Sequence, residues 1–234
     1  MKVLSRLLQS FVNALGLTVI RGHTFTLLSD PGPLELISRY GISCHSILHI
    51  GGHFAEEADT YSKWKISKVL FIEGDPRVFL KMMDHLSNFS KQDGMCVVLS
   101  NKSEEANFYL SSNEGASSSI LKPGRHLMHK PGVTFDESLE LPTKTLDSLG
   151  LDPFDLIVLD VQGAEKMVIE GGMETIKKAK VLWVEVNAGG MYQNDANSSE
   201  VVAALSEFFV PIYMNMGIHL WGNALFIRKN LTNI

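Results

Sequence analysis

Apolar and polar positions follow one another along the chain in a pattern that predicts alternating strands and helices. Short apolar runs at residues 46–50, 68–74 and 95–100 predict three strands. The segments between them, residues 54–64 and 76–89, have helical spacing. In the second segment one apolar face is formed by Val78, Phe79, Met82, Met83 and Leu86. This order predicts a parallel sheet with helices on both faces.

The second half of the chain resumes the alternation and ends differently. Strands are predicted at 154–160 and 180–187, with one or two helices at 163–179 between them and a helix at 197–209 that Asn197 caps. The last two predicted strands, 210–216 and 224–229, are too close for a helical crossover. They therefore pair antiparallel.

Residues 101–143 break the pattern. A strand is predicted at 105–110, but residues 111–142 are rich in Ser, Gly and Pro and have no sustained period. Long irregular segments in compact domains are often functional loops. We expect residues 111–143 to form a substrate loop or lid.

The N-terminal residues 1–42 are expected to form a helical extension of a single domain at residues 43–234. One apolar helical face is formed by Leu4, Leu7, Leu8, Phe11 and Leu15, and polar residues interrupt it too often for a membrane span. Docking on the domain or on a second copy, as a homo-oligomer, is favoured over binding to a membrane surface. Pro33 starts a further short helix that ends near Tyr40.

The amino-acid composition limits the kinds of binding partner and metal site that are expected. The net charge of −5 and the pI near 5.9 argue against a nucleic-acid partner, which favours a basic face. Cys44 and Cys96 are far apart and form no CxxC pair, which argues against a disulfide scaffold or a thiolate zinc site. We interpret them as two buried thiols in a reducing, cytoplasmic compartment.

The end of the first strand has the features of a cofactor-binding turn. Gly51 and Gly52 let a ligand approach the backbone closely, and the next helix offers free N–H groups. Glu73 ends the second strand, where dinucleotide folds place the acid that binds ribose; an exposed strand-end charge is the alternative.

A dinucleotide is nevertheless disfavoured as the cofactor. The fingerprint G-x-G-x-x-G fails, because His53 and Glu56 occupy its later glycine positions. Glu56 and Glu57 would also repel a pyrophosphate, whereas they suit the ammonium and sulfonium groups of S-adenosylmethionine.

Several blocks of the sequence together resemble the FkbM-type methyltransferases. They are "ILHIGGHFAEEADTY", "VLFIEGDP", "VVLSNKS", "GASSSIL", "TLDSL", "LDVQGAE", "VEVN" and "HLWGNALFIRK", within residues 46–229. These proteins are similar to other class I enzymes that use S-adenosylmethionine, and many methylate hydroxyl groups of sugars or natural products. The resemblance implies an α/β, Rossmann-like class I methyltransferase fold whose seven-stranded, mostly parallel sheet has an antiparallel last strand.

The resemblance also implies roles for individual residues. Gly51, Gly52 and His53 would line the methionine end of the cofactor, Glu73 would hold the ribose, and Ser100 would lie beside the adenine. Asp160 and Gln162 would face the reacting methyl group, and Ser117, Ser118 and Ser119 would lie near the cofactor or the acceptor.

Two positions depart from the family pattern. His49 stands where most class I enzymes have an acid that contacts the cofactor's amino end. Ala55 stands where a glycine is common, and alanine is well tolerated if the position is helical.

Methyl transfer to a hydroxyl requires alignment and a general base. Asp160 is the preferred base, with His53, His126 and His129 as alternatives. Asp160 could instead cap the following helix. His126 and His129 could instead lie in a solvated loop without a role in catalysis. His126 is also assigned to acceptor binding. No metal motif is present, although a site built from Asp160 and another carboxylate stays open.

The sequence therefore predicts S-adenosylmethionine-dependent O-methylation of a small-molecule or glycan hydroxyl. A non-catalytic binding or assembly module with the same fold is the alternative, which His49 favours. An oxidoreductase is disfavoured by the missing glycines.

Overall fold

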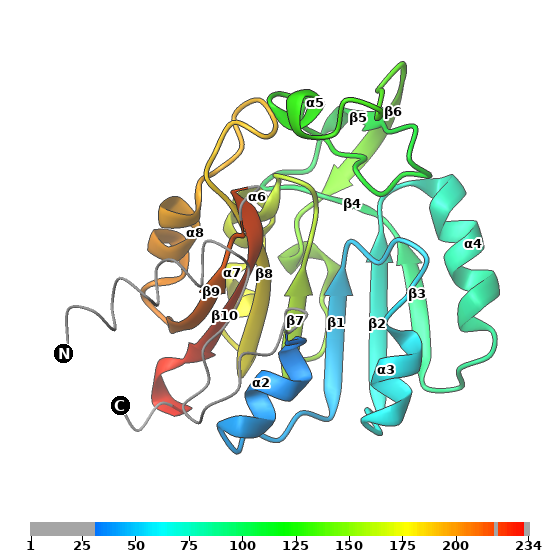
Figure 1. The fold of residues 1–234 in the computed structure, drawn as a ribbon. Helices are drawn as coiled ribbons and strands as arrows, with labels where there is room; N and C mark the ends of the chain where they lie inside the picture. Colours follow the sequence, from blue (N-terminus) through cyan, green and yellow to red (C-terminus); the bar gives the residue numbers. More distant parts are fainter. Residues whose placement is uncertain (1–30, 218–219, 232–234) are drawn as a thin grey trace, which may run out of the picture.

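The computed structural model describes residues 31–217 and 220–231, and its centre is a seven-stranded sheet (Figure 1). The strand order is β3-β2-β1-β7-β8-β10-β9. All neighbours are parallel except β10, which is antiparallel to both β8 and β9. The strands are β1 (Ser46–Ile50), β2 (Lys68–Glu73), β3 (Gln92–Cys96), β7 (Leu156–Leu159), β8 (Val181–Asn187), β9 (Phe209–Asn215) and β10 (Trp221–Arg228).

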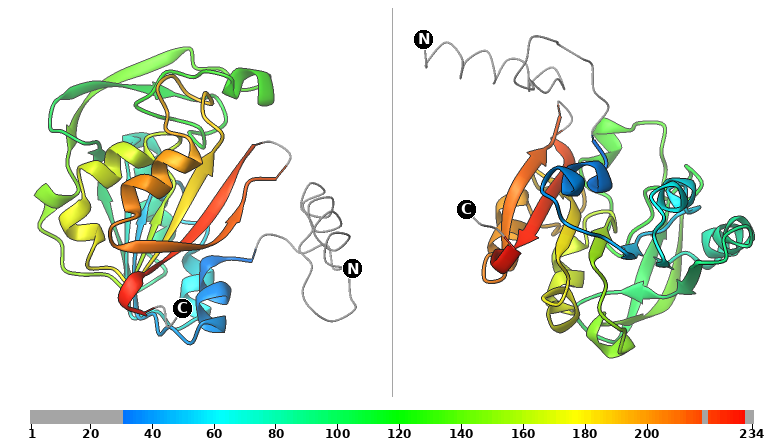
Figure 2. Two further views of the ribbon diagram at one scale, coloured as in Figure 1. Left: turned by 90° about the vertical axis from the view of Figure 1, so that its left-hand side faces the viewer. Right: turned by 90° about the horizontal axis from the view of Figure 1, so that it is seen from below.

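Helices cover both faces of this sheet, as Figure 2 shows. One face carries α2 (Pro33–Arg39), α3 (Ala58–Lys63) and α4 (Pro76–Leu86). The other carries α6 (Glu165–Glu170), α7 (Met173–Ile176) and α8 (Ser198–Leu205). Successive residues of β7 contribute to opposite cores, Leu156 and Val158 to the first and Ile157 and Leu159 to the second. Because the side chains of a strand alternate between two faces and both faces are covered here, β7 is apolar at every position.

A smaller sheet lies over the carboxyl ends of the main strands (Figure 1). Its order is β4-β6-β5, formed by β4 (Val98–Leu99), β6 (Glu137–Lys144) and β5 (Glu105–Leu110). The short helix α5 (His126–His129) lies in the β5–β6 connection. The prediction of no regular structure throughout 111–142 is therefore wrong at its end, because β6 pairs with β5. Only one residue of β6, Thr143, is fully buried, which left little pattern to detect.

Most other predicted elements are confirmed, with two changes of boundary. Asn197 caps α8 in a capping box with Glu200, and the terminal hairpin is antiparallel. The predicted strand at 95–100 is divided between β3 and β4, which belong to different sheets. The predicted helix at 54–64 starts only at Ala58.

Ala55 consequently lies outside the helix. Its φ of 58° is in the left-handed region, so the expectation of a helical alanine is wrong. This conformation costs a residue with a Cβ about 1–2 kcal/mol, which gives a physical reason for glycine at this position.

Only part of the predicted N-terminal extension, residues 1–42, lies within the described residues. The apolar face formed by Leu4 to Leu15 lies outside them, and with it the proposed oligomer contact. Helix α2, in contrast, buries Leu34, Leu36 and Ile37 in the core that β1 shares. Among the described residues no helix is both long and apolar enough to cross a membrane.

Both cysteines are free, but only one is partly buried. Cys44 is half-buried, and burial raises the pKa of its thiol to about 12. Cys96 is exposed, so the interpretation of two buried thiols is wrong for this residue. It ends the edge strand β3, where side chains have no further strand beside them.

The Gly51 turn joins the three central strands at their carboxyl ends. The N–H groups of Gly51 and Gly52 both donate to the carbonyl oxygen of Ile72, at 2.9 Å each. Gly51 has a φ of 87°, and a Cβ at this position would lie 1.6 Å from the carbonyl oxygen of Asp160. The chain therefore requires glycine here for both conformation and space.

We predict that Gly51→Ala lowers the free energy of unfolding by more than about 2 kcal/mol, because it adds a backbone clash to a left-handed strain. Chemical denaturation followed by circular dichroism measures this. Gly132→Ala is the matched control, since no atom lies within 4 Å of the added Cβ. Equal stability of the two variants would contradict the requirement for glycine at position 51.

Candidate functional site

A cavity of about 370 Å³ opens at the carboxyl ends of β1, β2 and β7. Its walls come from the ends of these strands, from the Gly51 turn and from the segment after β5. The lining residues most relevant to chemistry are His49, Gly51, Gly52, His53, Glu56, Glu57, Glu73, Ser118, Asp160 and Gln162. The structure thus brings together eight of the predicted site residues, which come from four separate segments of the chain.

Glu73 lies in the middle of this wall with its carboxylate fixed. One oxygen accepts the backbone N–H of His53 and the other that of Asp75, each at 2.8 Å. The residue is only 8% exposed, and burial raises the pKa of its carboxyl group. Each carboxylate oxygen keeps a second lone pair, so the side chain can still accept hydrogen bonds from a diol in the cavity.

One end of the cavity is apolar. Ile72, Val98, Leu99 and Phe108 line it. Ser100 does not, although the resemblance places it beside an adenine. Its backbone N–H donates to Lys144, and its own carbonyl group packs against Gly171 on the far side. The three residues before it, 97–99, take the place in the cavity that was expected for Ser100.

His49 is a buried, uncharged member of the wall. Its Nδ1 lies 2.9 Å from the hydroxyl oxygen of Tyr61, and its ring stacks on Phe71 with centroids 5.2 Å apart. Burial is the main influence on its pKa and lowers it, although the Glu57 carboxylate opposes this. The histidine therefore supplies a neutral polar edge where an acid would supply a charge.

Asp160 and Gln162 stand on a strained turn that other residues hold in place. Gln162 has a φ of 54°, and its amide nitrogen donates to Asp160 at 2.6 Å and to Glu185 at 3.2 Å. The Tyr192 hydroxyl group donates to the Gln162 amide oxygen at 3.1 Å. Ser119 donates to the Gln162 backbone carbonyl at 2.8 Å. These contacts orient the amide so that its nitrogen faces the acids.

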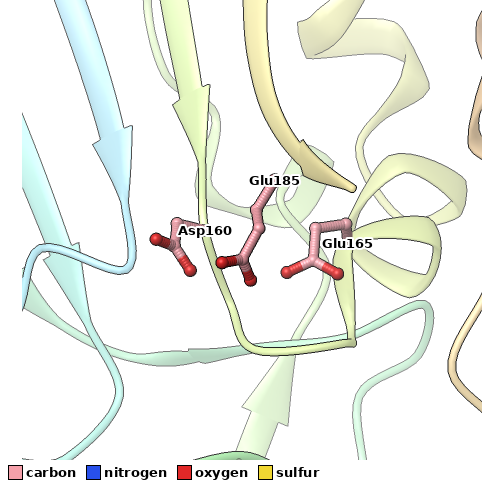
Figure 3. Close-up of side chains that lie close together, drawn as sticks. All are labelled: Asp160, Glu165 and Glu185. Carbon is pink, nitrogen blue, oxygen red and sulfur yellow. The ribbon is translucent and has the colours of Figure 1, made fainter. Parts of the chain in front are cut away.

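Three carboxylates converge beside this turn (Figure 3). Asp160 follows β7, Glu165 starts α6 and Glu185 comes from β8, and one oxygen of each lies within 4.8 Å of the others. Glu165 accepts the N–H groups of Val161 and Gly163. Burial and the nearby Asp160 charge raise the pKa of Glu165 to about 7 and that of Glu185 well above its usual range.

The acidic cluster can therefore hold protons near neutral pH, and its donor set is also one that a cation accepts. The sequence interpretation missed Glu165, Glu185 and Tyr192. The signal for Glu185 is an acid within the otherwise apolar run "VLWVEV". The prediction of no metal stays a prediction.

The serine-rich segment and His126 divide into lining and supporting residues. Ser118 lines the cavity, whereas Ser117 is fully buried with its hydroxyl oxygen 3.0 Å from His126 Nε2. His126 is 1% exposed and lines neither of the two cavities described here, so the solvated-loop interpretation is wrong for it. Burial lowers the pKa of His126 to about 4. His129 is exposed, as a solvated loop predicts.

His53 lines the cavity with both ring nitrogens engaged. Nδ1 lies 2.6 Å from a Glu56 carboxylate oxygen, and Nε2 lies 3.2 Å from the carbonyl oxygen of Glu114. Neither nitrogen is free to take a proton from an acceptor. Among the predicted bases this leaves Asp160 as the only one that lines the cavity with an oxygen able to accept a further proton.

We predict that the cluster makes the fold less stable as pH rises. The Glu165 carboxyl group titrates at about 7 in the folded chain against an ordinary 4.5, so the unfolded chain loses its proton first. The stability that protonation provides is present below about pH 4.5 and is lost towards pH 7. Glu185→Gln should remove a carboxylate from this cluster and stabilise the fold by about 1–2 kcal/mol near pH 8, with little effect near pH 4.5.

Denaturant titrations at the two pH values measure this difference. Glu140→Gln, at an exposed position of β6, controls for the loss of one negative charge. A Glu185→Gln gain that is equal at both pH values would contradict the proposed coupling.

Comparisons with known proteins agree with this geometry. The chain matches the Methyltransferase FkbM domain family over residues 49–210, from the His49 wall to the last helix and beyond. It is 29% identical over 183 residues to the 2-O-methyltransferase NoeI of Sinorhizobium fredii (strain NBRC 101917 / NGR234). That match covers 74% of this chain and 75% of NoeI.

A solved structure supports the fold. The magnesium protoporphyrin IX methyltransferase (ChlM) of Synechocystis PCC 6803, determined with bound S-adenosylmethionine, is similar with a TM-score of 0.50 at 9% identity. The match covers 83% of this chain and 74% of that one. The seven-stranded, mostly parallel sheet has the antiparallel last strand that the resemblance implies, and the family match spans all the residues that line the cavity. The chain is a methyltransferase and belongs to the FkbM family.

Proposed function

We propose that this chain transfers the methyl group of S-adenosylmethionine to a hydroxyl group of a small molecule or a glycan. The observation that carries the proposal is a single cavity with Glu73 on one side and the Asp160 turn on the other. In parallel α/β sheets, ligands bind at the carboxyl ends of the strands, which is where this cavity opens.

The residues of the cavity fit S-adenosylmethionine in chemistry and in order. The apolar end formed by Ile72, Val98 and Phe108 suits an adenine, and the adjacent Glu73 suits the ribose diol. The Gly51 turn offers backbone at close approach. The described lining contains four carboxylates and no lysine or arginine, which suits an ammonium and a sulfonium but not a pyrophosphate. When bound, the cofactor supplies an electrophilic methyl group.

The Asp160 carboxylate is proposed as the general base. It would take the proton of the acceptor hydroxyl as the new C–O bond forms and the C–S bond breaks. Gln162 donates to one oxygen of Asp160 and so orients the carboxylate in the cavity wall. A base held in this way aligns the nucleophile, which is the main task in a direct displacement.

Oxygen as the target atom is supported by the NoeI relative, which is named a 2-O-methyltransferase. Residues 115–120 line the cavity with Gly115, Ala116, Ser118 and Ile120. We therefore propose that the 111–143 segment shapes the acceptor site. His126 supports it from behind through Ser117. The alternative is a non-catalytic module with the same fold. A measurement of cofactor binding distinguishes this module from a methyltransferase.

We predict that Glu73→Gln weakens binding of S-adenosylhomocysteine at least about tenfold, because an amide offers the ribose diol only one acceptor oxygen. Isothermal titration calorimetry measures the affinity. Glu207→Gln, an exposed position beyond α8, is the control for charge. Unchanged affinity in Glu73→Gln would remove the ribose assignment, and no binding by the unaltered chain would favour the non-catalytic module.

We expect Asp160→Asn to lower kcat at least about 100-fold, because an amide cannot take the hydroxyl proton. Release of labelled methyl groups to a panel of neutral sugars and glycosides gives the rate. Binding of S-adenosylhomocysteine should change less than about tenfold, since that ligand has no methyl group to transfer. An unaltered kcat would exclude Asp160 as the base.

The same assay separates the two chemistries open to the acidic cluster. If the three carboxylates act only by sharing protons, a chelator leaves the rate unchanged. A rate that the chelator abolishes and Mg²⁺ restores would make Asp160, Glu165 and Glu185 a cation site.

A further inference from the structure

His53 connects the cofactor turn to the segment that covers the cavity. It follows Gly52 with a φ of 43°, a left-handed conformation that is rare for a residue with a Cβ. Its backbone N–H is fixed on Glu73, and its ring reaches across to the carbonyl of Glu114, 61 positions further along the chain. Such strain persists only where the surroundings hold it in place.

The two ring contacts of His53 impose a protonation state. The partner of Nδ1 is the Glu56 carboxylate at 2.6 Å, and the partner of Nε2 is a backbone carbonyl at 3.2 Å. Both partners are acceptors only, so each nitrogen must carry a proton. A neutral imidazole has one N–H and loses one of the two hydrogen bonds. The observed geometry therefore belongs to the imidazolium.

The segment that His53 contacts forms part of the cavity wall. Glu114 and Gly115 are both left-handed, with φ values of 59° and 92°. Gly115, Ala116 and Ser118 line the cavity directly after this turn. The Glu114 side chain adds only an exposed ion pair with Lys81 at 3.9 Å, and such pairs contribute little.

We propose that His53, as an imidazolium, latches the Glu114–Ser118 turn over the cofactor cavity and is a positioning residue for the cofactor. The consequence for cofactor affinity rests on the proposed function; the latch itself does not. This role replaces the expectation that His53 is a base, because a group that must keep both protons cannot accept a third.

The charged groups that face the ring are mainly acidic. Glu56 is in contact with it, and Glu73 acts on it from the end of β2. Glu57 lies on the same turn and also lines the cavity. Lys81 of α4 lies over the Phe54 ring, which itself packs on His53, and its charge is offset by Glu114. If the ring loses one of its two protons, the latch opens and the cofactor should bind more weakly.

Substitution of Glu56 separates the latch from other titrations. In Glu56→Gln the amide can donate to an unprotonated Nδ1, so a neutral imidazole with its proton on Nε2 satisfies both contacts. Glu57→Gln is the matched control for the pH dependence: it removes an equal charge from the adjacent position, whose carboxylate contacts His49 and not His53. Only the change of affinity with pH within each variant is compared, because Glu57 also lines the cavity.

The experiment is calorimetry with S-adenosylhomocysteine between about pH 6 and pH 8, the range in which histidine charge usually changes. We expect the affinity of the unaltered chain and of Glu57→Gln to fall about tenfold across this range, the size of one charge-assisted hydrogen bond. The affinity of Glu56→Gln should stay within about twofold. A Glu56→Gln profile that matches that of Glu57→Gln would overturn the proposal.

A second measurement needs no cofactor. The ¹⁵N resonances of the His53 ring, assigned by their loss in His53→Gln, should show both nitrogens protonated near pH 6 in the free chain. A neutral ring there would overturn the latch. If the ring is protonated but S-adenosylhomocysteine binds at no pH, the latch stands and the proposed cofactor fails.

Discussion

The close approach of the Gly51 backbone to the neighbouring strands is the constraint on which the site depends. Two N–H groups of the turn converge on the Ile72 carbonyl, while the Asp160 carbonyl occupies the space of a Cβ. This contact brings the ends of β1, β2 and β7 together. Glu73 and Asp160 consequently face one cavity, although 87 positions separate them. Without a glycine the strands would separate and the two acids with them.

Around this contact the chain places carboxylates in two different environments. Glu73 has its ionised form stabilised by two backbone N–H groups, which oppose the effect of burial. Glu165 and Glu185 are buried close to Asp160, and burial together with repulsion from Asp160 raises the pKa of both. This repulsion lies at the carboxyl ends of the strands, beside the cavity. Such conflicts with stability are expected at functional sites.

The segment between β5 and β6 is the part of the molecule in which local pattern and final structure differ most. It contains polar residues that are buried, including Ser117, Ser118 and His126, most of whose polar atoms pair with one another or with the backbone. His126 Nδ1 is the exception, since it has no hydrogen-bond partner among the described residues. Its contacts with Gln162, Tyr192 and His53 connect three loops above the sheet. This part of the cavity wall is therefore held mainly by hydrogen bonds and contains little of the apolar core.

The sequence by itself determined the order of strands and helices, the parallel sheet with its antiparallel end, and the positions of Glu73 and Asp160 at strand ends. These follow from local periodicity and from loop length, which act over a few residues. Only the tertiary structure decided that Ser100 does not line the cavity, that β6 pairs with β5, and that Glu165 and Glu185 join Asp160. It also decided that His53 meets Glu56 and the Glu114 carbonyl at once. Each of these depends on contacts between segments distant in the chain, and no local pattern of apolar and polar residues records such contacts.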